Sequence, residues 1–131
     1  MFFGLCNAPA SFQRMIDIRF KVVLDSGCVR IYMDDILILG DTLEEVEYWT
    51  RKVLQTMRES GLSCKPVKCQ FEKPIVKYLG HMIGEGKLFV NPSKIAGIAD
   101  WPVPRKLRDV QSFLGTMNFW QKFIQRFSHI A

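Results

Sequence analysis

Two adjacent carboxylates, Asp34 and Asp35, are the side chains best suited to chemistry in this 131-residue sequence. They lie between two short apolar runs, 29–33 and 36–39, which predict the strands of a hairpin. Aspartate also tolerates the backbone angles of tight turns, and a structural role explains one or two acids in such a loop. It explains less well why such apolar strands converge on two like charges, which repel each other without a cation. The pattern favours a site for Mg²⁺, which prefers hard oxygen ligands.

The elements around this hairpin follow from periodicity and capping signals. Apolar residues recur at helical spacing over about 9–25, with Asn7 as the expected N-cap. They recur again over 43–60, where Thr42 and Glu45 match a capping box. The other expected elements are a strand over 75–83 that turns around Gly80, a turn over 84–87, a strand over 88–90, and helices over about 93–101 and 107–127.

Charge is distributed unevenly, with a net of −2 over residues 1–64 and +7 over residues 65–131. A basic half beside an acidic half predicts a polyanion-binding surface next to a carboxylate site, although a solvated basic surface explains the charge alone equally well. No apolar run approaches 18 residues, and the opening segment lacks the features of a signal peptide. The sequence therefore predicts an intracellular protein without a membrane partner and does not distinguish a cytoplasmic particle from the nucleus.

The four cysteines show neither a CxxC pair nor the spacing of a disulfide framework. A zinc site built from Cys64, Cys69 and His81 is conceivable, but structural zinc sites usually have more closely spaced ligand pairs. Reduced, partly buried thiols are the favoured interpretation.

Five segments carry a family resemblance, and they occur in the family's order. They are Phe2–Gln13, similar to PFGLxNAPxxFQ; Tyr32–Asp35, which matches the YxDD box; Gly61–Phe71, similar to GLxLxxxKCxF; Tyr78–Ile83, similar to FLGHxI; and Ser112–Gly115 with Phe123 and Ile124, similar to SFLG…FI. A single YxDD string recurs by chance, whereas five ordered motifs are specific. Over its whole length the chain resembles the reverse transcriptase of gypsy-like LTR retrotransposons, from the middle of the palm into the thumb.

The resemblance implies an α+β fold. Residues 1–90 would form a partial polymerase palm, an antiparallel sheet with packed helices and the YxDD hairpin, and residues 91–131 a helical thumb or connection segment. The implied activity is RNA-directed DNA polymerisation by two-metal nucleotidyl transfer, with two Mg²⁺ ions and Mn²⁺ as a possible substitute. The implied partners are an RNA or DNA template with its primer, deoxynucleoside triphosphates and the remainder of a retroelement polyprotein.

The resemblance also assigns roles to individual residues. Asp34 and Asp35 would bind metal, Asp34 more directly, and Lys68 would donate a proton to the leaving pyrophosphate, with Lys65 as a nearby substitute. The other implied roles are nucleotide binding by Phe3, Gly4 and Gln13, packing of Tyr32 and Met33 under the primer terminus, and a primer grip at Leu79, Gly80 and His81. Judged singly, Phe3 and Tyr32 are more often core residues, Lys68 a solvated lysine and His81 an ordinary strand residue.

The sequence departs from the family pattern in several places. The family's third carboxylate precedes the PFGL-like segment with which this chain begins, and the fingers are missing, so the chain is expected to be inactive alone. Phe2 replaces the usual Pro, and Gln121 the usual Arg after an aromatic pair. The alternative function is a non-catalytic, basic nucleic-acid-binding remnant of a retroelement. An RNA polymerase palm is disfavoured because the flanking motifs match reverse transcriptases better.

Overall fold

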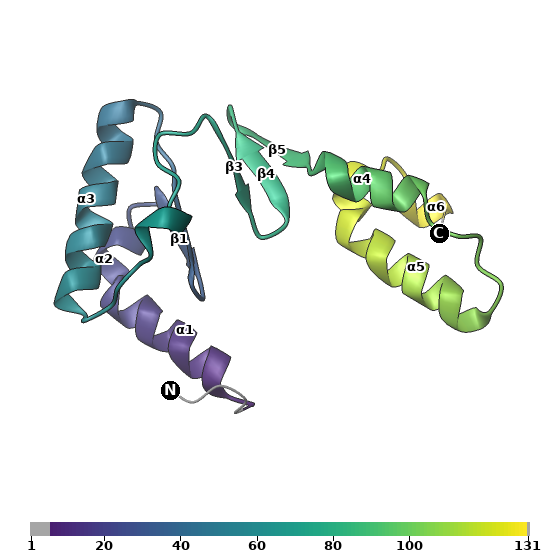
Figure 1. The fold of residues 1–131 in the computed structure, drawn as a ribbon, viewed down its shortest axis with the longest axis horizontal. Coiled ribbons are helices and arrows are strands. Elements are labelled where there is room, and N and C mark those ends of the chain that lie inside the picture. Colours follow the sequence, from purple (N-terminus) through teal and green to yellow (C-terminus); the bar gives the residue numbers. More distant parts are fainter. Residues whose placement is uncertain (1–5, 131) are drawn as a thin grey trace. The chain divides into compact units, whose positions relative to one another are not determined.

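The structure is a computed structural model that describes residues 6–130, and it divides into two compact units at the bond between Leu79 and Gly80. The first unit contains α1 (Ala8–Arg19), α2 (Lys21–Leu24), β1 (Val29–Tyr32), β2 (Asp35–Ile38), α3 (Leu43–Glu59), the 3₁₀ turn η1 (Pro66–Lys68) and β3 (Ile75–Tyr78) (Figure 1). The second contains β4 (His81–Gly84), β5 (Lys87–Val90), α4 (Pro92–Ala99), α5 (Leu107–Trp120), the 3₁₀ turn η2 (Gln121–Phe123) and α6 (Phe127–Ile130). Among the described residues, no helix is long and apolar enough to cross a membrane.

The core of the first unit lies between its helices and one face of the β1–β2 hairpin. β1 and β2 are antiparallel, and Val29 pairs with Ile38 and Ile31 with Ile36. Because paired residues point to the same face, this face of the hairpin is continuously apolar. α2 contacts β1, and α3 contacts both α2 and β2 (Figure 1). The buried core residues are Ile16, Phe20, Val23, Val29, Ile31, Val53 and Met57.

The predicted helix over 9–25 is wrong in its continuity and in its cap. The backbone leaves helical geometry at Phe20 (φ −99°, ψ 12°), between α1 and α2. The break coincides with one of the most buried side chains of the unit, where tertiary packing outweighs helix propensity. Asn7 makes no side-chain cap because its backbone is itself helical, whereas a capping residue normally has extended geometry. Its carbonyl instead accepts the amide hydrogen of Ser11.

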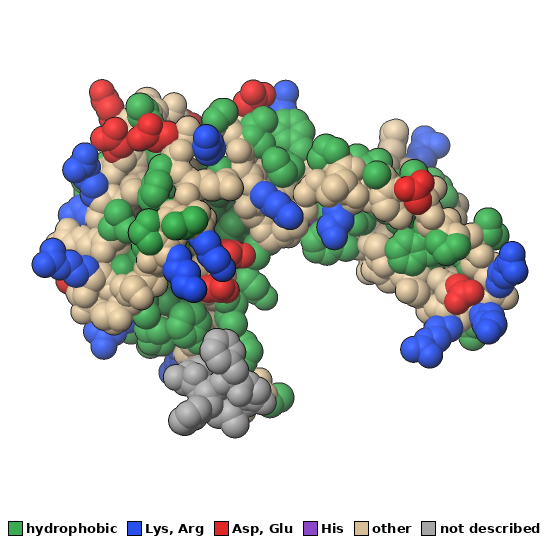
Figure 2. Space-filling view, viewed as in Figure 1, with side chains coloured by type: hydrophobic (Ala, Val, Ile, Leu, Met, Phe, Trp, Pro, Cys, Tyr) green, Lys and Arg blue, Asp and Glu red, His purple; other side chains and the backbone are tan. Residues whose placement is uncertain are grey.

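The start of α3 confirms half of the predicted capping box. The Thr42 hydroxyl accepts a hydrogen bond from the Glu45 amide at 3.2 Å. The Glu45 carboxylate, however, accepts from the amide of Asp41, at 3.0 Å, rather than from that of Thr42. Figure 2 shows acidic side chains gathered at the end of the unit where α3 begins, which suits the positive end of the helix dipole. The helix ends at Glu59, before Gly61, as predicted.

In the second unit, β4 and β5 form an antiparallel hairpin in which His81 pairs with Val90. Their two-residue turn has positive φ at both Glu85 (51°) and Gly86 (67°), the geometry of tight hairpins, and it confirms the predicted turn. The predicted helix over 107–127 is wrong in length. α5 ends at Trp120, which has φ −102° and ψ 0° and a side chain only 5% exposed, and η2 and α6 follow.

Candidate metal-binding turn

The acidic turn lies one residue earlier than the sequence predicts. Tyr32 pairs with Asp35, so the two connecting residues are Met33 and Asp34, and Asp35 is already the first residue of β2. Met33 has a φ of 56°, in the left-handed region that non-glycine residues rarely occupy. Such a residue stores on the order of 1–3 kcal/mol of strain and persists only when its surroundings impose it.

Both carboxylates of the turn are accessible. Asp34 and Asp35 are exposed. Within residues 6–130 no cation pairs with either carboxylate and no hydrogen-bond donor reaches one. Two hard oxygen donors on a tight turn fit a divalent cation that keeps several of its waters. Across the described part of the chain, no group of three or more His, Cys, Asp or Glu side chains converges.

Gln13 holds the turn from α1. Its Oε1 accepts the Met33 amide hydrogen at 2.7 Å, and its Nε2 donates to the Ile31 carbonyl oxygen at 3.2 Å and to Asp17 Oδ1 at 2.8 Å. Loss of this acceptor would leave a part-buried amide unsatisfied, which costs about 1–3 kcal/mol. This energy is similar in size to the strain at Met33. The contact from Gln13 is therefore strong enough to decide the shape of the turn.

A tyrosine that the sequence reasoning missed lies close to the other face of the hairpin. This face carries Arg30 paired with Leu37 and Tyr32 paired with Asp35. Burial raises the pKa of Tyr78, at the end of β3, and the Asp35 charge raises it further while Arg30 acts in the opposite direction. The Tyr78 hydroxyl therefore lies within electrostatic reach of the acidic turn. Tyr78 opens the FLGHxI-like segment, but the sequence holds no signal that places it near Asp35.

The two predicted lysines are not brought to the turn by any contact among the described residues. Lys68 is the last residue of η1, and both Lys68 and Lys65 are exposed. No ion pair joins Lys68 to Asp34 or Asp35 in the part of the chain that the structure describes. Tyr32 is 57% exposed. Phe3 and Gly4 lie outside the described residues.

The predicted primer-grip residues continue from the first unit into the second. Leu79 and Gly80 both have positive φ, 47° and 83°, and His81 begins β4. The His81 ring stacks on Phe119 with centroids 5.0 Å apart and an interplanar angle of 9°. Trp120 meets the same ring edge-on at 5.3 Å. Lys122 Nζ lies 3.4 Å from His81 Nε2, while His81 Nδ1 is buried without a partner among the described residues.

The burial of His81 in this aromatic environment makes the stability of the second unit depend on pH. Burial, and after it the Lys122 charge, lowers the pKa of His81 in the folded chain. On acidification the His81 ring is protonated in the unfolded chain before it is protonated in the folded chain. The contribution of the neutral ring to the free energy of unfolding is therefore complete above about pH 6.5, and it is lost as the pH falls through the folded-state pKa of His81. We expect the second unit to unfold at lower temperature as the pH falls from 7 to 5. The measurement is thermal unfolding followed by near-ultraviolet circular dichroism across this pH range.

The matched variants are His81→Phe and His129→Phe, which remove the two histidines of the chain in turn. His129 is exposed on α6 and lies outside the aromatic cluster. His81→Phe should preserve the stacking and remove most of the pH dependence, and His129→Phe should leave it unchanged. Equal pH dependence in all three proteins would contradict the role of His81.

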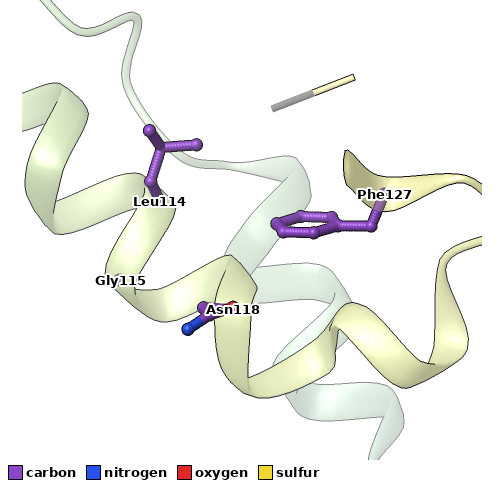
Figure 3. Close-up of a pocket in the computed structure, with 4 residues that line it drawn as sticks. All are labelled: Leu114, Gly115, Asn118 and Phe127. Carbon is purple, nitrogen blue, oxygen red and sulfur yellow. The ribbon is translucent and has the colours of Figure 1, made fainter. Parts of the chain in front are cut away.

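Two cavities lined by described residues of the second unit contain no predicted site residue. One is an open pocket lined by Leu114, Gly115 and Asn118 of α5 and by Phe127 of α6. Figure 3 shows the Phe127 ring directed toward the side of α5 that carries Leu114 (Figure 3). The other runs from the end of α4 to α5 and is lined by residues that include Trp101, Val103 and Arg105. No charged side chain lines the first pocket, which offers little to an ionic ligand.

Comparison with known sequences identifies relatives among retrotransposon polyproteins. The family described as "Reverse transcriptase (RNA-dependent DNA polymerase)" matches residues 1–83. The chain is 34% identical over 129 residues to the retrovirus-related Pol polyprotein from transposon 297 of Drosophila melanogaster, covering 98% of this chain and 12% of the relative. It is 32% identical over 129 residues to the transposon Tf2-3 polyprotein of Schizosaccharomyces pombe, covering 98% and 10%. The chain thus spans about a tenth of the curated relatives it matches.

Comparison with solved structures agrees with the α+β prediction. The foamy viral protease-reverse transcriptase in complex with dsDNA superimposes with a TM-score of 0.86 at 27% identity, over 99% of this chain and 27% of the viral chain. The foamy viral protein in complex with an RNA/DNA hybrid gives a TM-score of 0.75 at 26% identity, over 91% and 16%. The fold class predicted from sequence is therefore confirmed.

Proposed function

Because the chain belongs to the reverse transcriptase (RNA-dependent DNA polymerase) family, we propose that it is the catalytic-turn segment of a gypsy-like LTR retrotransposon polymerase. By family it is a fragment of an RNA-directed DNA polymerase, and its relatives are retrotransposon polyproteins. In this proposal residues 1–90 belong to the palm and residues 91–131 begin the thumb. The substrates are deoxynucleoside triphosphates and a primer on an RNA or DNA template.

The observation that carries the proposal is the accessible pair of carboxylates on a turn held from two directions. Val29 and Ile31 anchor one face of the hairpin in the core, and Gln13 binds the backbone of the turn. Asp34 and Asp35 remain exposed at the end of this rigid support. A turn needed only to reverse the chain gains nothing from two adjacent like charges. A turn that binds divalent cations requires them.

Asp34 and Asp35 would together hold Mg²⁺, with Mn²⁺ as a substitute, and Asp34 would be the more direct ligand. Bound divalent cations supply charge stabilisation at the attacking and leaving oxygens of nucleotidyl transfer. Lys68 would give a proton to the leaving pyrophosphate, and Lys65 is the nearby substitute. Both lysines are exposed on or beside η1, which leaves their ammonium groups accessible to a phosphate.

The other residues of the site would orient the substrates. Tyr32 and Met33 would pack under the primer terminus, and Tyr32 has the exposed ring that such a contact requires. The backbone around Leu79, Gly80 and His81 would support the primer strand. Phe3 and Gly4 would lie under the sugar of the incoming nucleotide.

The number of carboxylates limits what this segment does by itself. Two carboxylates bind a pair of divalent cations weakly, because each cation lacks charge compensation and ligands. A polypeptide of these 131 residues alone is therefore proposed not to extend a primer efficiently. Efficient extension by that polypeptide with Mg²⁺ would refute this part of the proposal.

A second candidate function is non-catalytic binding of nucleic-acid phosphates. Arg105, Lys106 and Arg108 are exposed around the start of α5, and Figure 2 shows basic side chains gathered at this end of the second unit (Figure 2). Cations at a helix N-terminus are unfavourable for the helix itself, so such a cluster favours an anionic partner. Binding of this kind weakens steeply with salt because each phosphate contact releases counterions.

One binding experiment separates the two functions. A labelled primer–template duplex is titrated with the chain in Mg²⁺ and in EDTA, over a series of salt concentrations. The polymerase proposal predicts a Mg²⁺-dependent component of binding that is lost in Asp34→Asn. Non-catalytic binding predicts affinity that is indifferent to Asp34→Asn. In that case Ala at Arg105, Lys106 and Arg108 should reduce the slope of log affinity against log salt by about 0.9 for each phosphate contact removed.

A further inference from the structure

The side chain of Gln13 uses most of its hydrogen-bonding capacity on contacts within the first unit. Asp17, one helical turn further along α1, accepts one Nε2 hydrogen, and the Ile31 carbonyl oxygen accepts the other. The Met33 amide occupies the Oε1 acceptor. A glutamine amide has two donors and one acceptor oxygen with two lone pairs. A single lone pair on Oε1 is left for any further partner, which leaves little capacity for direct recognition of a nucleotide.

Asp17 helps to fix which way the Gln13 amide faces, together with the Ile31 carbonyl oxygen and the Met33 amide. An ionised carboxylate only accepts hydrogen bonds, so it selects the orientation in which Nε2 points toward it. That orientation directs Oε1 at the Met33 amide, the residue of the turn with positive φ. The pair is an i,i+4 contact on the surface of α1, and its effect reaches a turn 20 residues away in the sequence.

We propose that Gln13 is a positioning residue for the Asp34–Asp35 turn, and that Asp17 orients it. Gln13 does not touch the substrate. It keeps Met33 in its left-handed conformation and thereby fixes the direction in which the two carboxylates leave the hairpin. This inference rests on the metal-binding function proposed above, because its consequence is the affinity of that turn for a divalent cation.

The size of the effect follows from the population of the correctly shaped turn. If the loss of Gln13 lowers that population to about a tenth, the apparent affinity for a cation falls about tenfold. The rest of the unit should be unaffected, because its core residues do not include Gln13. A purely structural role would instead lower overall stability and leave the affinity of the folded chain unchanged.

The experiment compares three variants of the full chain with the unsubstituted protein. Gln13→Leu removes the acceptor and both donors. Gln13→Glu is the conservative variant, since it keeps an acceptor for the Met33 amide but cannot donate to Asp17 or Ile31. Gln55→Leu is the matched control, because Gln55 makes the same kind of i,i+4 contact, to Glu59 at 2.9 Å on the exposed side of α3. Among the described residues, Gln55 has no backbone partner in another element.

Two quantities are measured. The first is the hydrogen-exchange rate of the Met33 amide in metal-free protein, followed by nuclear magnetic resonance. The second is Mn²⁺ affinity, followed by paramagnetic broadening of the Asp34 and Asp35 resonances. We expect Gln13→Leu to accelerate Met33 exchange and weaken Mn²⁺ binding, both by about tenfold. Gln13→Glu should restore only part of the Met33 protection, because its carboxylate accepts from the Met33 amide but repels Asp17 and the Ile31 carbonyl oxygen. Gln55→Leu should match the unsubstituted protein in both measurements.

The outcomes separate this inference from the function on which it rests. Unchanged Met33 exchange in Gln13→Leu overturns the positioning role directly. Faster exchange with unchanged Mn²⁺ affinity also overturns it, because the turn then binds its cation without Gln13. If the unsubstituted chain binds no Mn²⁺ at millimolar concentration while Gln13 still protects the Met33 amide, the metal-binding function fails, whereas the shaping of the turn by Gln13 stands.

Discussion

Primer extension is expected to fall on the order of a thousandfold when Asp34 is replaced by asparagine in an active polymerase that carries this segment. Asparagine preserves the size of the side chain but removes the negative charge that a divalent cation requires. Asp35→Asn should act in the same direction. Replacing these residues should not unfold the hairpin, because both side chains are exposed and make no described contact with the core.

The assay requires a polypeptide with the rest of the polymerase. The polypeptide for the assay is the transposon 297 polyprotein with residues 1–131 in place of its matching part, to which they align over 129 residues. The control is Asp41→Asn, which removes an exposed aspartate outside the turn and should leave extension within about twofold. Retention of a tenth or more of the activity in Asp34→Asn would contradict the assignment of the turn as the metal site.

The largest expected effect on stability is that of Phe20→Ala, at about 3–5 kcal/mol. Phe20 is 1% exposed and packs in the core that also contains Val29 and Ile31 of the hairpin. Removing the ring loses the free energy gained when the ring is transferred from water into the core. It also leaves a cavity beside the strands that carry the acidic turn. A loss of this size is a large share of the 5–15 kcal/mol typical of a folded domain.

The measurement is urea unfolding followed by hydrogen exchange of amides in α1, α2 and α3, which reports on the first unit alone. Phe71→Ala is the control, because Phe71 has the same side chain but is 53% exposed. Its effect should stay below roughly 1 kcal/mol. Similar losses in the two variants would show that the core does not lie where the structure has it.

The sequence predicted most elements because their signals are local. The hairpin strands, the end of α3 before Gly61 and the Glu85–Gly86 turn all follow from periodicity and turn residues. The prediction failed where tertiary contacts, and not the local sequence, determine where a helix ends. Phe20 interrupts the first helix where its ring enters the core, and α5 stops at the buried Trp120.

The candidate site shows the same division between local and distant causes. The pair Asp34 and Asp35 stands out because two apolar strands flank it. The hydrogen bond from the Met33 amide to Gln13 Oε1 joins residues 20 positions apart, and no spacing rule for a helix or a strand predicts such a contact. Tyr78 is further still from Asp35 in sequence, and its proximity appears only in the folded chain.

The division at Leu79 and Gly80 gives the protein an intrinsic optical reporter for each unit. Trp49 is the tryptophan of the first unit and packs against its core, whereas Trp101 and Trp120 both belong to the second. Trp101 meets Phe113 edge-on, and Trp120 lies among Phe119 and Phe123. Replacing Trp49 with phenylalanine leaves fluorescence from the second unit only, and replacing the other two leaves it from the first. Each emission spectrum then follows the melting of one unit without an added dye.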